Sequence, residues 1–232
     1  MATFLKICQD IARESGTVAA PLATVAVGPD KWTAKIVAWG RQAWIDIQNA
    51  HESWRFLRKE FEDALSAGTA TYTPASFSSI ENFGAWRNDP ERGDTVTIYD
   101  PDIGPADEGA LCHLDWDTFK RRFRRGVQTN NKPGYWSINP TGEFCIGPAP
   151  DKAYIVKGEY IRAPQELTKD DDIPICPAQF HSVIIWYALI LLVEHDSDSV
   201  FDLAAATRRY NRAVSDLEAS QLPGLRLAGP LA

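Results

Sequence analysis

The residues best suited to chemistry in this chain are His113, Asp115 and Asp117, which fall within five positions. An imidazole beside two carboxylates is a donor set with which hydrolases and nucleases hold a metal ion that activates water. None of the usual sequence motifs of nucleophilic, zinc-peptidase or nucleotide-binding enzymes occurs. The other histidines are too dispersed to complete a triad: His51, His181 and His195. A metal-dependent hydrolase or nuclease is therefore an alternative, and we assign no catalytic residue, metal or cofactor.

Two acidic segments resemble metal sites without meeting their requirements. Asp170, Asp171 and Asp172 are consecutive, and neighbouring side chains of an extended chain point to opposite faces, so they form no oxygen cage. We expect them in an exposed linker, where they favour the positive end of the helix that follows Pro177. The segment DPDIGPADEG, which begins at Asp100, lacks the fixed glycine and the distal glutamate of a calcium-binding EF-hand.

A basic run places five cations in six positions around Phe123: Lys120, Arg121, Arg122, Arg124 and Arg125. One interpretation is an electrostatic contact with an acidic partner or a phosphate backbone. The other is a solvated helix face whose buried side is Phe119 and Phe123, four residues apart. A plain nucleic-acid-binding module is a further alternative, although a net charge of -7 argues against a protein whose main work is to grip phosphates.

The composition is that of a folded globular protein. Of 232 residues, 44% are hydrophobic and 24% charged, and eight tryptophans are the only excess, as expected of an interface or a large core. The four cysteines are scattered without a C-x-x-C pair, which predicts neither a zinc site nor a disulfide framework and favours a reducing compartment. The N-terminus lacks the apolar run of a signal peptide. Residues 183–193 are about half the roughly 20 residues of a membrane span, so no membrane partner is expected.

Helical periodicity appears at both ends of the chain. Thr3 is placed to cap a short helix that Gly16 ends, and a second helix is expected from about Lys31 to Leu57. Trp32 and Trp39 lie off its apolar stripe, which suggests a contact with another element or subunit. After Pro177 the helical period returns. A last helix, expected to start near residue 197 or 199, has apolar positions at alternating steps of three and four: Val200, Leu203, Thr207, Tyr210, Val214 and Leu217.

The centre of the chain changes to a period of two with many turn residues. This pattern predicts an antiparallel β-region over 58–164, with loops at 76–91 and 100–109 and one basic helix over 116–126. The predicted fold class is α+β. Its helical bundle is formed by N-terminal helices (1–57) and C-terminal helices (165–221), with the β-region inserted between them and an extended tail at 222–232.

The order of four segments from Lys132 onward carries a resemblance to a known family: KPGYW, GPAPDKAY, KGEYIRAPQEL and DDDIPICPAQFHSVIIWYAL. The sequence is similar to the head-to-tail adaptors of tailed bacteriophages, a group that includes neck, connector and tail tubular protein A-like proteins. The similarity extends to FLKICQDIARESG and WIDIQNAHESWRFLR, so it covers nearly the whole chain. Each motif is weak alone, and the specificity lies in their order.

This resemblance implies a structural protein of the virion, placed at the head–tail junction and assembled in the host cytoplasm. It implies a homo-oligomeric ring, usually a dodecamer, that docks beneath the portal protein and carries a downstream tail or nozzle protein. Genomic DNA would pass through the lumen without sequence-specific binding. Helices would pack side by side in such a ring, which makes four residues candidates for the lateral interface: Trp32, Trp39, Tyr210 and Val214. Short-tailed and long-tailed phages remain open alternatives.

The C-terminal tail LPGLRLAGPLA is apolar and rich in turn residues, so it forms little structure alone. In the family that the sequence resembles, this segment commonly reaches the portal. The candidates for that contact are Leu222, Leu225, Arg226, Leu227 and Leu231. The alternative is a tail that folds back on its own domain.

Overall fold

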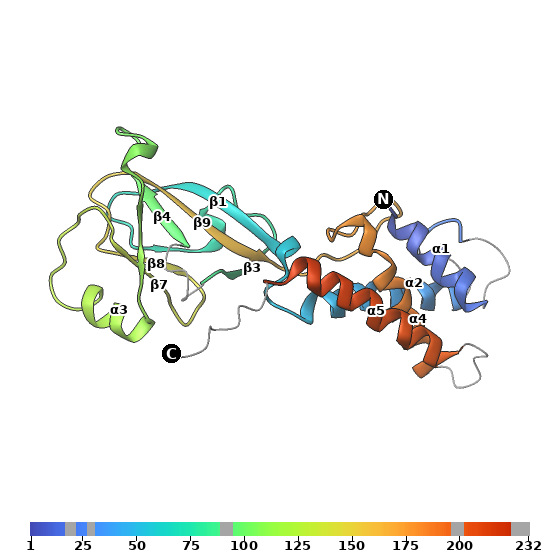
Figure 1. Ribbon diagram of the computed structural model, residues 1–232. Coiled ribbons are helices and arrows are strands. Elements are labelled where there is room, and N and C mark those ends of the chain that lie inside the picture. Colours follow the sequence, from blue (N-terminus) through green and yellow to red (C-terminus); the bar gives the residue numbers. More distant parts are fainter. Residues whose placement is uncertain (17–21, 27–30, 89–94, 196–201, 224–232) are drawn as a thin grey trace, which may run out of the picture. The chain divides into compact units, whose positions relative to one another are not determined.

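The computed structural model describes residues 1–16, 22–26, 31–88, 95–195 and 202–223. They belong to two compact units (Figure 1). The helical unit combines residues 1–57 with the chain from Pro164 onward, and the β-unit comprises 58–163. Apart from one short helix within the β-unit, helices and largely antiparallel strands are segregated along the chain, and the predicted α+β class is confirmed.

Helix α1 (Phe4–Ser15) begins and ends where the sequence predicted. The hydroxyl of Thr3 accepts a hydrogen bond from the backbone N–H of Lys6 (3.3 Å), and Gly16 ends the helix in the left-handed conformation at φ 65°. The buried face includes Phe4, Ile7, Cys8 and Ile11. Local capping and an amphipathic stripe therefore determine this helix.

Helix α2 (Lys31–Asn49) is shorter than predicted, since it ends before residue 57. The chain reverses after Asn49, and the indole N–H of Trp54 donates to the carbonyl oxygen of Ile47 (2.9 Å). Trp54 is fully buried and stacks on Phe56, whose ring also stacks on Trp44 of the helix. Trp54, which lies within the range predicted to be helical, instead belongs to the returning chain and covers the end of the helix.

Helix α4 (Ser182–His195) contacts α1, α2 and α5. It starts later than Pro177, because a 3-10 turn at Ala178–Phe180 comes first. The fully buried positions include Ile184, Ala188 and Leu192, whereas Tyr187 is half-buried. Because this helix is apolar on all sides and packs against three neighbours, its sequence has no single apolar stripe from which the buried positions could be predicted.

Helix α5 (Leu203–Gln221) also begins later than predicted. The carboxylate of Asp202 accepts from the backbone N–H of Ala205 (3.1 Å) and so caps the helix at that point. Leu203, which was assigned to the apolar stripe, is exposed, whereas Leu217 is buried as predicted and Ala206 is buried in addition. The predicted stripe position Val200 lies outside the described residues.

The β-unit contains two sheets. In the first, the order is β1-β9-β4-β5, and β3 pairs with another part of β9. In the second, the order is β2-β8-β7-β6, in which β6 and β7 are parallel, contrary to the all-antiparallel prediction. The strands are β1 (Arg58–Leu65), β2 (Thr71–Tyr72), β3 (Phe83–Trp86), β4 (Val96–Tyr99), β5 (Gly109–Ala110), β6 (Cys112–His113), β7 (Tyr135–Ile138), β8 (Phe144–Gly147) and β9 (Tyr154–Arg162).

Strand β3 lies in a segment that we expected to be a loop. It pairs with the end of β9, through Trp86 with Tyr160 and Ala85 with Ile161, in a register that shifts between residues 83 and 85. The irregular register and the two glycine or alanine residues of FGAW weaken the period of two on which a strand prediction relies. Tertiary pairing with β9 therefore determines this strand.

An aromatic cluster joins the two sheets of the β-unit. The ring of Phe144 on β8 lies 5.2 Å from that of Trp86 on β3 and 5.4 Å from that of Trp136 on β7, measured between centroids. Phe61 and Phe77 complete the cluster from the other side. Four of the eight tryptophans are buried in the two cores, so the surplus of tryptophan is in part a core feature: Trp44, Trp54, Trp86 and Trp136.

The acidic segment after β9 is not the exposed linker that the sequence suggested. Leu167 and Cys176 are buried, and Gln165 joins this segment to α2. The side-chain oxygen of Gln165 accepts from the indole N–H of Trp44 (3.2 Å), and its backbone exchanges two hydrogen bonds with the amide of Gln48 (2.8 and 3.1 Å). Residues 164–177 are therefore a fixed part of the helical unit.

The aspartates of this segment hold α1. The carbonyl oxygens of Asp172 and Asp170 accept from the first backbone N–H groups of α1, those of Phe4 (2.7 Å) and Leu5 (3.1 Å). The carboxylate of Asp170 also accepts from the backbone N–H of Val25 (2.6 Å). These residues therefore satisfy the N-terminus of α1, whereas the sequence suggested that they favour the helix after Pro177.

Replacing Gln165 with alanine should destabilise the helical unit by about 2 kcal/mol, because a buried indole N–H and a backbone N–H lose their common acceptor. The control is Gln42→Ala on the exposed face of α2, expected to change stability by less than about 0.5 kcal/mol. Urea unfolding followed by the helical circular-dichroism signal compares the two. Equal stability of both variants would contradict the role of Gln165.

Candidate interaction surfaces

The basic run lies on helix α3 (Trp116–Phe123), which is three residues shorter than predicted. The carboxylate of Asp115 caps it by accepting from the backbone N–H of Thr118 (2.9 Å). Phe119 is fully buried, and Phe123 packs over Gly147 of β8, where a Cβ atom added to the glycine would lie 2.5 Å from the ring. The helix thus packs on the second sheet through the side that carries these two phenylalanines.

The five cations of this run divide into two groups. Arg124 donates to the carbonyl oxygen of Ala70 (3.1 Å) and to the hydroxyl of Thr71, and Arg122 lies over the ring of Tyr135 at 4.1 Å. These two arginines attach the helix to its own unit. The other three are exposed and make no ion pair with a described residue: Lys120, Arg121 and Arg125.

The apolar residue Val127 follows these cations at once and is fully exposed. The helix and the start of the following loop therefore present three exposed cations beside one apolar side chain, and Arg121 among them also donates to the hydroxyl of Thr118 (3.1 Å). We call this surface, formed by Lys120, Arg121, Arg125 and Val127, the basic surface. It combines the two predicted interpretations, because one side of α3 is core and another is available for an acidic partner.

The residues of the alternative catalytic site do not converge. Asp115 is engaged as the cap of α3, and His113 contacts the ring of Trp136 (4.7 Å) and the side-chain amide of Asn88. Burial lowers the pKa of His113, so the imidazole is mainly neutral at pH 7. Across the described residues, no three histidine, cysteine or acidic side chains are grouped as metal ligands.

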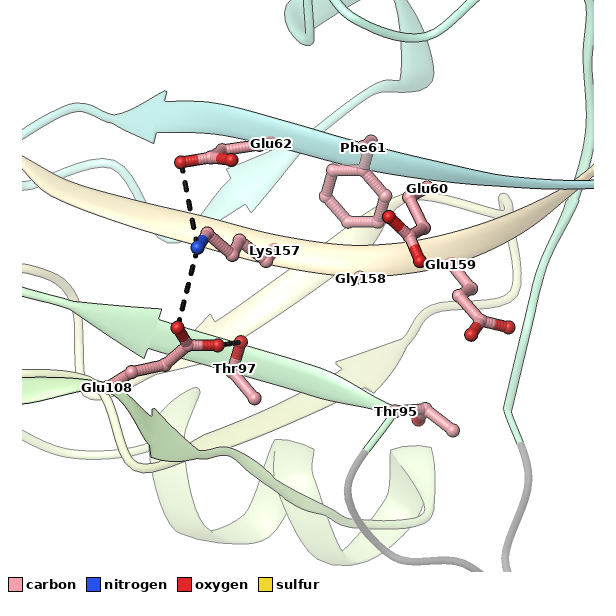
Figure 2. Close-up of a pocket in the computed structure, with 9 residues that line it drawn as sticks. All are labelled: Glu60, Phe61, Glu62, Thr95, Thr97, Glu108, Lys157, Gly158 and Glu159. Carbon is pink, nitrogen blue, oxygen red and sulfur yellow. Dashed lines mark hydrogen bonds and ion pairs between the residues drawn. The ribbon is translucent and has the colours of Figure 1, made fainter. Parts of the chain in front are cut away.

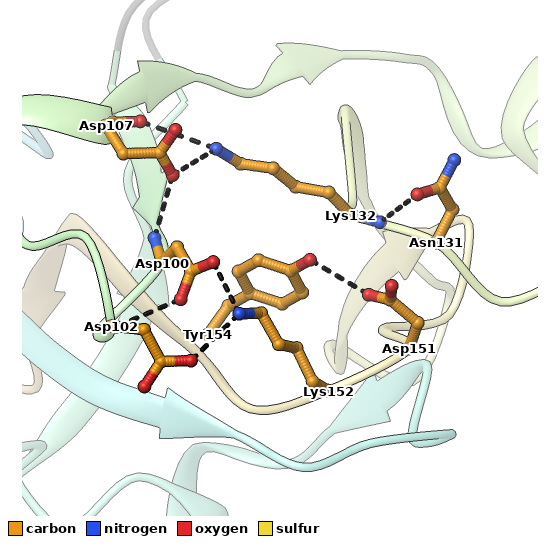
Figure 3. Close-up of polar contacts among 8 residues, drawn as sticks. All are labelled: Asp100, Asp102, Asp107, Asn131, Lys132, Asp151, Lys152 and Tyr154. Carbon is orange, nitrogen blue, oxygen red and sulfur yellow. Dashed lines mark hydrogen bonds and ion pairs between the residues drawn. The ribbon is translucent and has the colours of Figure 1, made fainter.

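A second candidate surface is the loop between β4 and β5, which includes the 3-10 turn Pro105–Asp107 (Figure 3). Lysine side chains form ion pairs with the aspartates of this loop. The ammonium of Lys152 lies 2.5 Å from the carboxylate of Asp100 and 3.0 Å from that of Asp102, and Lys132 lies 2.5 Å from that of Asp107. The carboxylate of Asp107 also accepts from the backbone N–H of Asp100 (3.0 Å).

These contacts make the loop a rigid projection. The hydrogen bond from Lys152 lowers the pKa of Asp100, and that from Lys132 lowers the pKa of Asp107. Because both carboxyls titrate lower in the folded state, their stabilising contribution is present above about pH 4 and is lost as the pH falls through the folded pKa. The loop presents Ile103, whose exposed fraction is 63%, and Asp102, whose side chain is 81% exposed. We call the loop over 100–107 the acidic loop.

A shallow groove on the first sheet is a third candidate (Figure 2). Glycine at position 158 leaves room on β9, and the ring of Phe61 fills part of it. The ammonium of Lys157 bridges the carboxylates of Glu108 (3.4 Å) and Glu62 (3.8 Å). Burial works against this charge, but the hydrogen bond to Glu108 holds the pKa of Lys157 above its ordinary value. The groove is thus an ion-pair network, in which the carboxylate of Glu108 also accepts from the hydroxyl of Thr97 (2.6 Å).

The candidates for a lateral interface lie on the helical unit. Trp32 and Trp39 of α2 are half-buried, and the ammonium of Lys35 lies over both rings, at 4.9 and 5.9 Å from their centroids. Tyr210 stacks on Tyr187 at 5.0 Å, so this side chain serves the packing of α5 on α4, and Val214 is half-buried.

The C-terminal candidates are only partly described. The backbone N–H of Leu222 donates to the carbonyl oxygen of Glu218 (2.9 Å), and this bond ends α5. The other four lie outside the described residues: Leu225, Arg226, Leu227 and Leu231.

The sequence did not predict the acidic loop as a braced structure, because its two lysines are distant along the chain. Asp107 and Lys132 are 25 residues apart, and Asp102 and Lys152 are 50. The segment GPAPDKAY, which contains Lys152, was informative only as part of a family pattern. The local sequence did not indicate which carboxylates would form ion pairs with Lys152.

The β-unit therefore carries a basic surface and a braced acidic loop. The sequence matches the SU10 adaptor protein family over residues 2–231, and the chain belongs to that family. It is therefore an adaptor-type structural protein of bacteriophage, a virion component that associates with other capsid or tail components. No curated protein sequence matches the chain. No helix within the described ranges is long and apolar enough to cross a membrane.

Replacing Gly147 with alanine should detach α3 from the second sheet, because the new methyl group would meet Phe123 at 2.5 Å. The expected destabilisation is about 1–3 kcal/mol, with faster amide hydrogen exchange over residues 116–123. Gly134→Ala is the matched control, since an added Cβ there meets no atom within 4 Å. Unchanged exchange protection of α3 in Gly147→Ala would show that Phe123 does not hold the helix.

Proposed function

We propose that this adaptor assembles as a closed ring of twelve copies beneath the portal, extends the DNA channel and provides the surface to which the tail or nozzle attaches. The observation that carries the proposal is the family match, which extends over both units and the C-terminal segment. A closed ring requires two different complementary faces on each subunit. The helical unit supplies candidates for lateral contacts in Trp32, Trp39, Tyr210 and Val214.

Passage of DNA through this ring needs no sequence-specific contact. The net charge of -7 supports a lumen that does not hold the phosphate backbone, because a protein binds DNA tightly by neutralising many phosphates. The genome could then move freely through the ring, because the lumen would bind the DNA only weakly.

Mass measurement of the purified protein, alone and with a portal ring, tests the proposal. We expect a particle of about twelve subunits, formed alone or upon portal contact, because portal binding can order an interface that the free subunit lacks. Native mass spectrometry gives the copy number, and electron microscopy shows whether the particle is closed. A chain that stays monomeric in the presence of the portal would refute the ring.

The C-terminal tail is the proposed contact with the portal. Deleting residues 223–232 should abolish portal binding and leave the subunit folded, because Leu225, Leu227 and Leu231 provide the apolar part of the contact. Arg226→Ala should weaken binding less, since it removes only a polar contact. Binding to immobilised portal and a thermal melt are measured on the same samples. Loss of folding on deletion would show instead that the tail folds back on its own domain.

A further inference from the structure

The cations of the basic surface form no ion pair within the part of the subunit that the structure describes. Lys120, Arg121 and Arg125 are exposed and form no ion pair with a described residue, although the chain as a whole is acidic. Arg122 and Arg124 hold α3 in place, so the three exposed cations lie on an anchored helix or directly after it. A fixed, uncompensated positive surface is suited to a partner with a negative one.

The acidic loop has the opposite composition. Three aspartates (Asp100, Asp102 and Asp107) share two lysines, so a negative charge remains on the projection. Because the loop is braced at both ends, binding would cost little conformational entropy. The exposed Ile103 adds an apolar contact at its tip, as Val127 does at the basic surface.

The two surfaces lie at different ends of the β-unit. In Figure 1 the short green turn of the acidic loop projects beyond β4, whereas α3 lies at the far end of the same unit. They therefore cannot neutralise each other within one subunit. A head-to-tail contact between two copies brings them together, and such heterologous contacts can close into rings.

We propose that the acidic loop of one copy docks on the basic surface of the next. The inference rests on the proposed assembly of copies and identifies the partner of both surfaces as a second copy of this chain. Charge complementarity gives the contact its direction, and Ile103 and Val127 supply apolar area between the charges. An exposed valine among the cations favours a protein partner over DNA, since phosphates offer no apolar surface.

Charge reversal tests this contact. A loop variant carries Asp102→Lys, and a helix variant carries Lys120→Glu with Arg125→Glu, which spares the two arginines that anchor α3. Each variant alone should raise the dissociation constant between subunits by at least about tenfold, as measured by sedimentation and native mass spectrometry. For the wild type, association should weaken when salt is raised from low concentration to about 0.5 M.

Mixing the two variants gives the decisive result. The lysine loop of one then faces the glutamate helix of the other, and each retains one wild-type surface, so a ring of alternating copies should form. Glu60→Lys makes the same charge change as the loop variant, and Arg55→Glu makes one of the two reversals of the helix variant; both positions are exposed and lie outside both surfaces, so these variants should assemble like the wild type. Ile103→Ser, which leaves the aspartate–lysine brace intact, should also weaken association.

Normal assembly of both reversed variants, or a mixture that stays dissociated, would overturn this inference while a wild-type ring would still support the proposed function. Normal assembly combined with impaired DNA delivery by the helix variant would assign the basic surface to DNA instead. A wild type that never forms a ring with the portal would refute both proposals.

Discussion

The pairing of β1 with β9 is the constraint on which the rest of the structure depends. These strands run antiparallel from Arg58 opposite Ile161 to Leu65 opposite Tyr154, so the chain enters and leaves the β-unit at neighbouring positions. Closing a loop of this length carries an entropic cost that grows only slowly with the number of residues. The long strand pair therefore permits a β-unit to be inserted into a helical unit, because both chain ends are returned to the same place. Strand β9 also pairs with β4 and β3 on its other edge, which makes it the centre of the first sheet.

The segment after β9 converts this return into a fixed helical unit. Gln165 reaches α2 almost as soon as the chain leaves the strand, and the carbonyl oxygens of Asp170 and Asp172 complete the N-terminus of α1. The two halves of the helical unit, distant in sequence, are thus joined by hydrogen bonds before α4 begins. Leu167 and Cys176 of this segment are buried, so residues 164–177 belong to the helical unit and are not the exposed linker that the acidic sequence suggested.

The features that could be predicted from sequence are those determined locally. Thr3 and Asp115 cap their helices and Gly16 ends one, because a capping side chain acts within three residues. The features that were missed depend on distant partners. Trp54 turns back on α2, and β3 exists through its pairing with β9. The same division holds for the surfaces: the basic run was visible as a run, whereas the bracing of Asp100 and Asp107 by Lys152 and Lys132 required the fold.

The distribution of charge explains more about this protein than its net value. The groove on the first sheet and the acidic loop both contain carboxylates that are matched by lysines of the same subunit, and this matching stabilises the local structure. The free cations of α3 are not matched in this way by any described residue, although acidic residues outnumber basic ones in the chain by 31 to 24. An isolated subunit gains nothing from leaving them unpaired. Under the proposed assembly, these cations would pair with the acidic loop of a neighbouring subunit. Charges that can pair only between subunits favour the correct intersubunit contact over pairing within one chain.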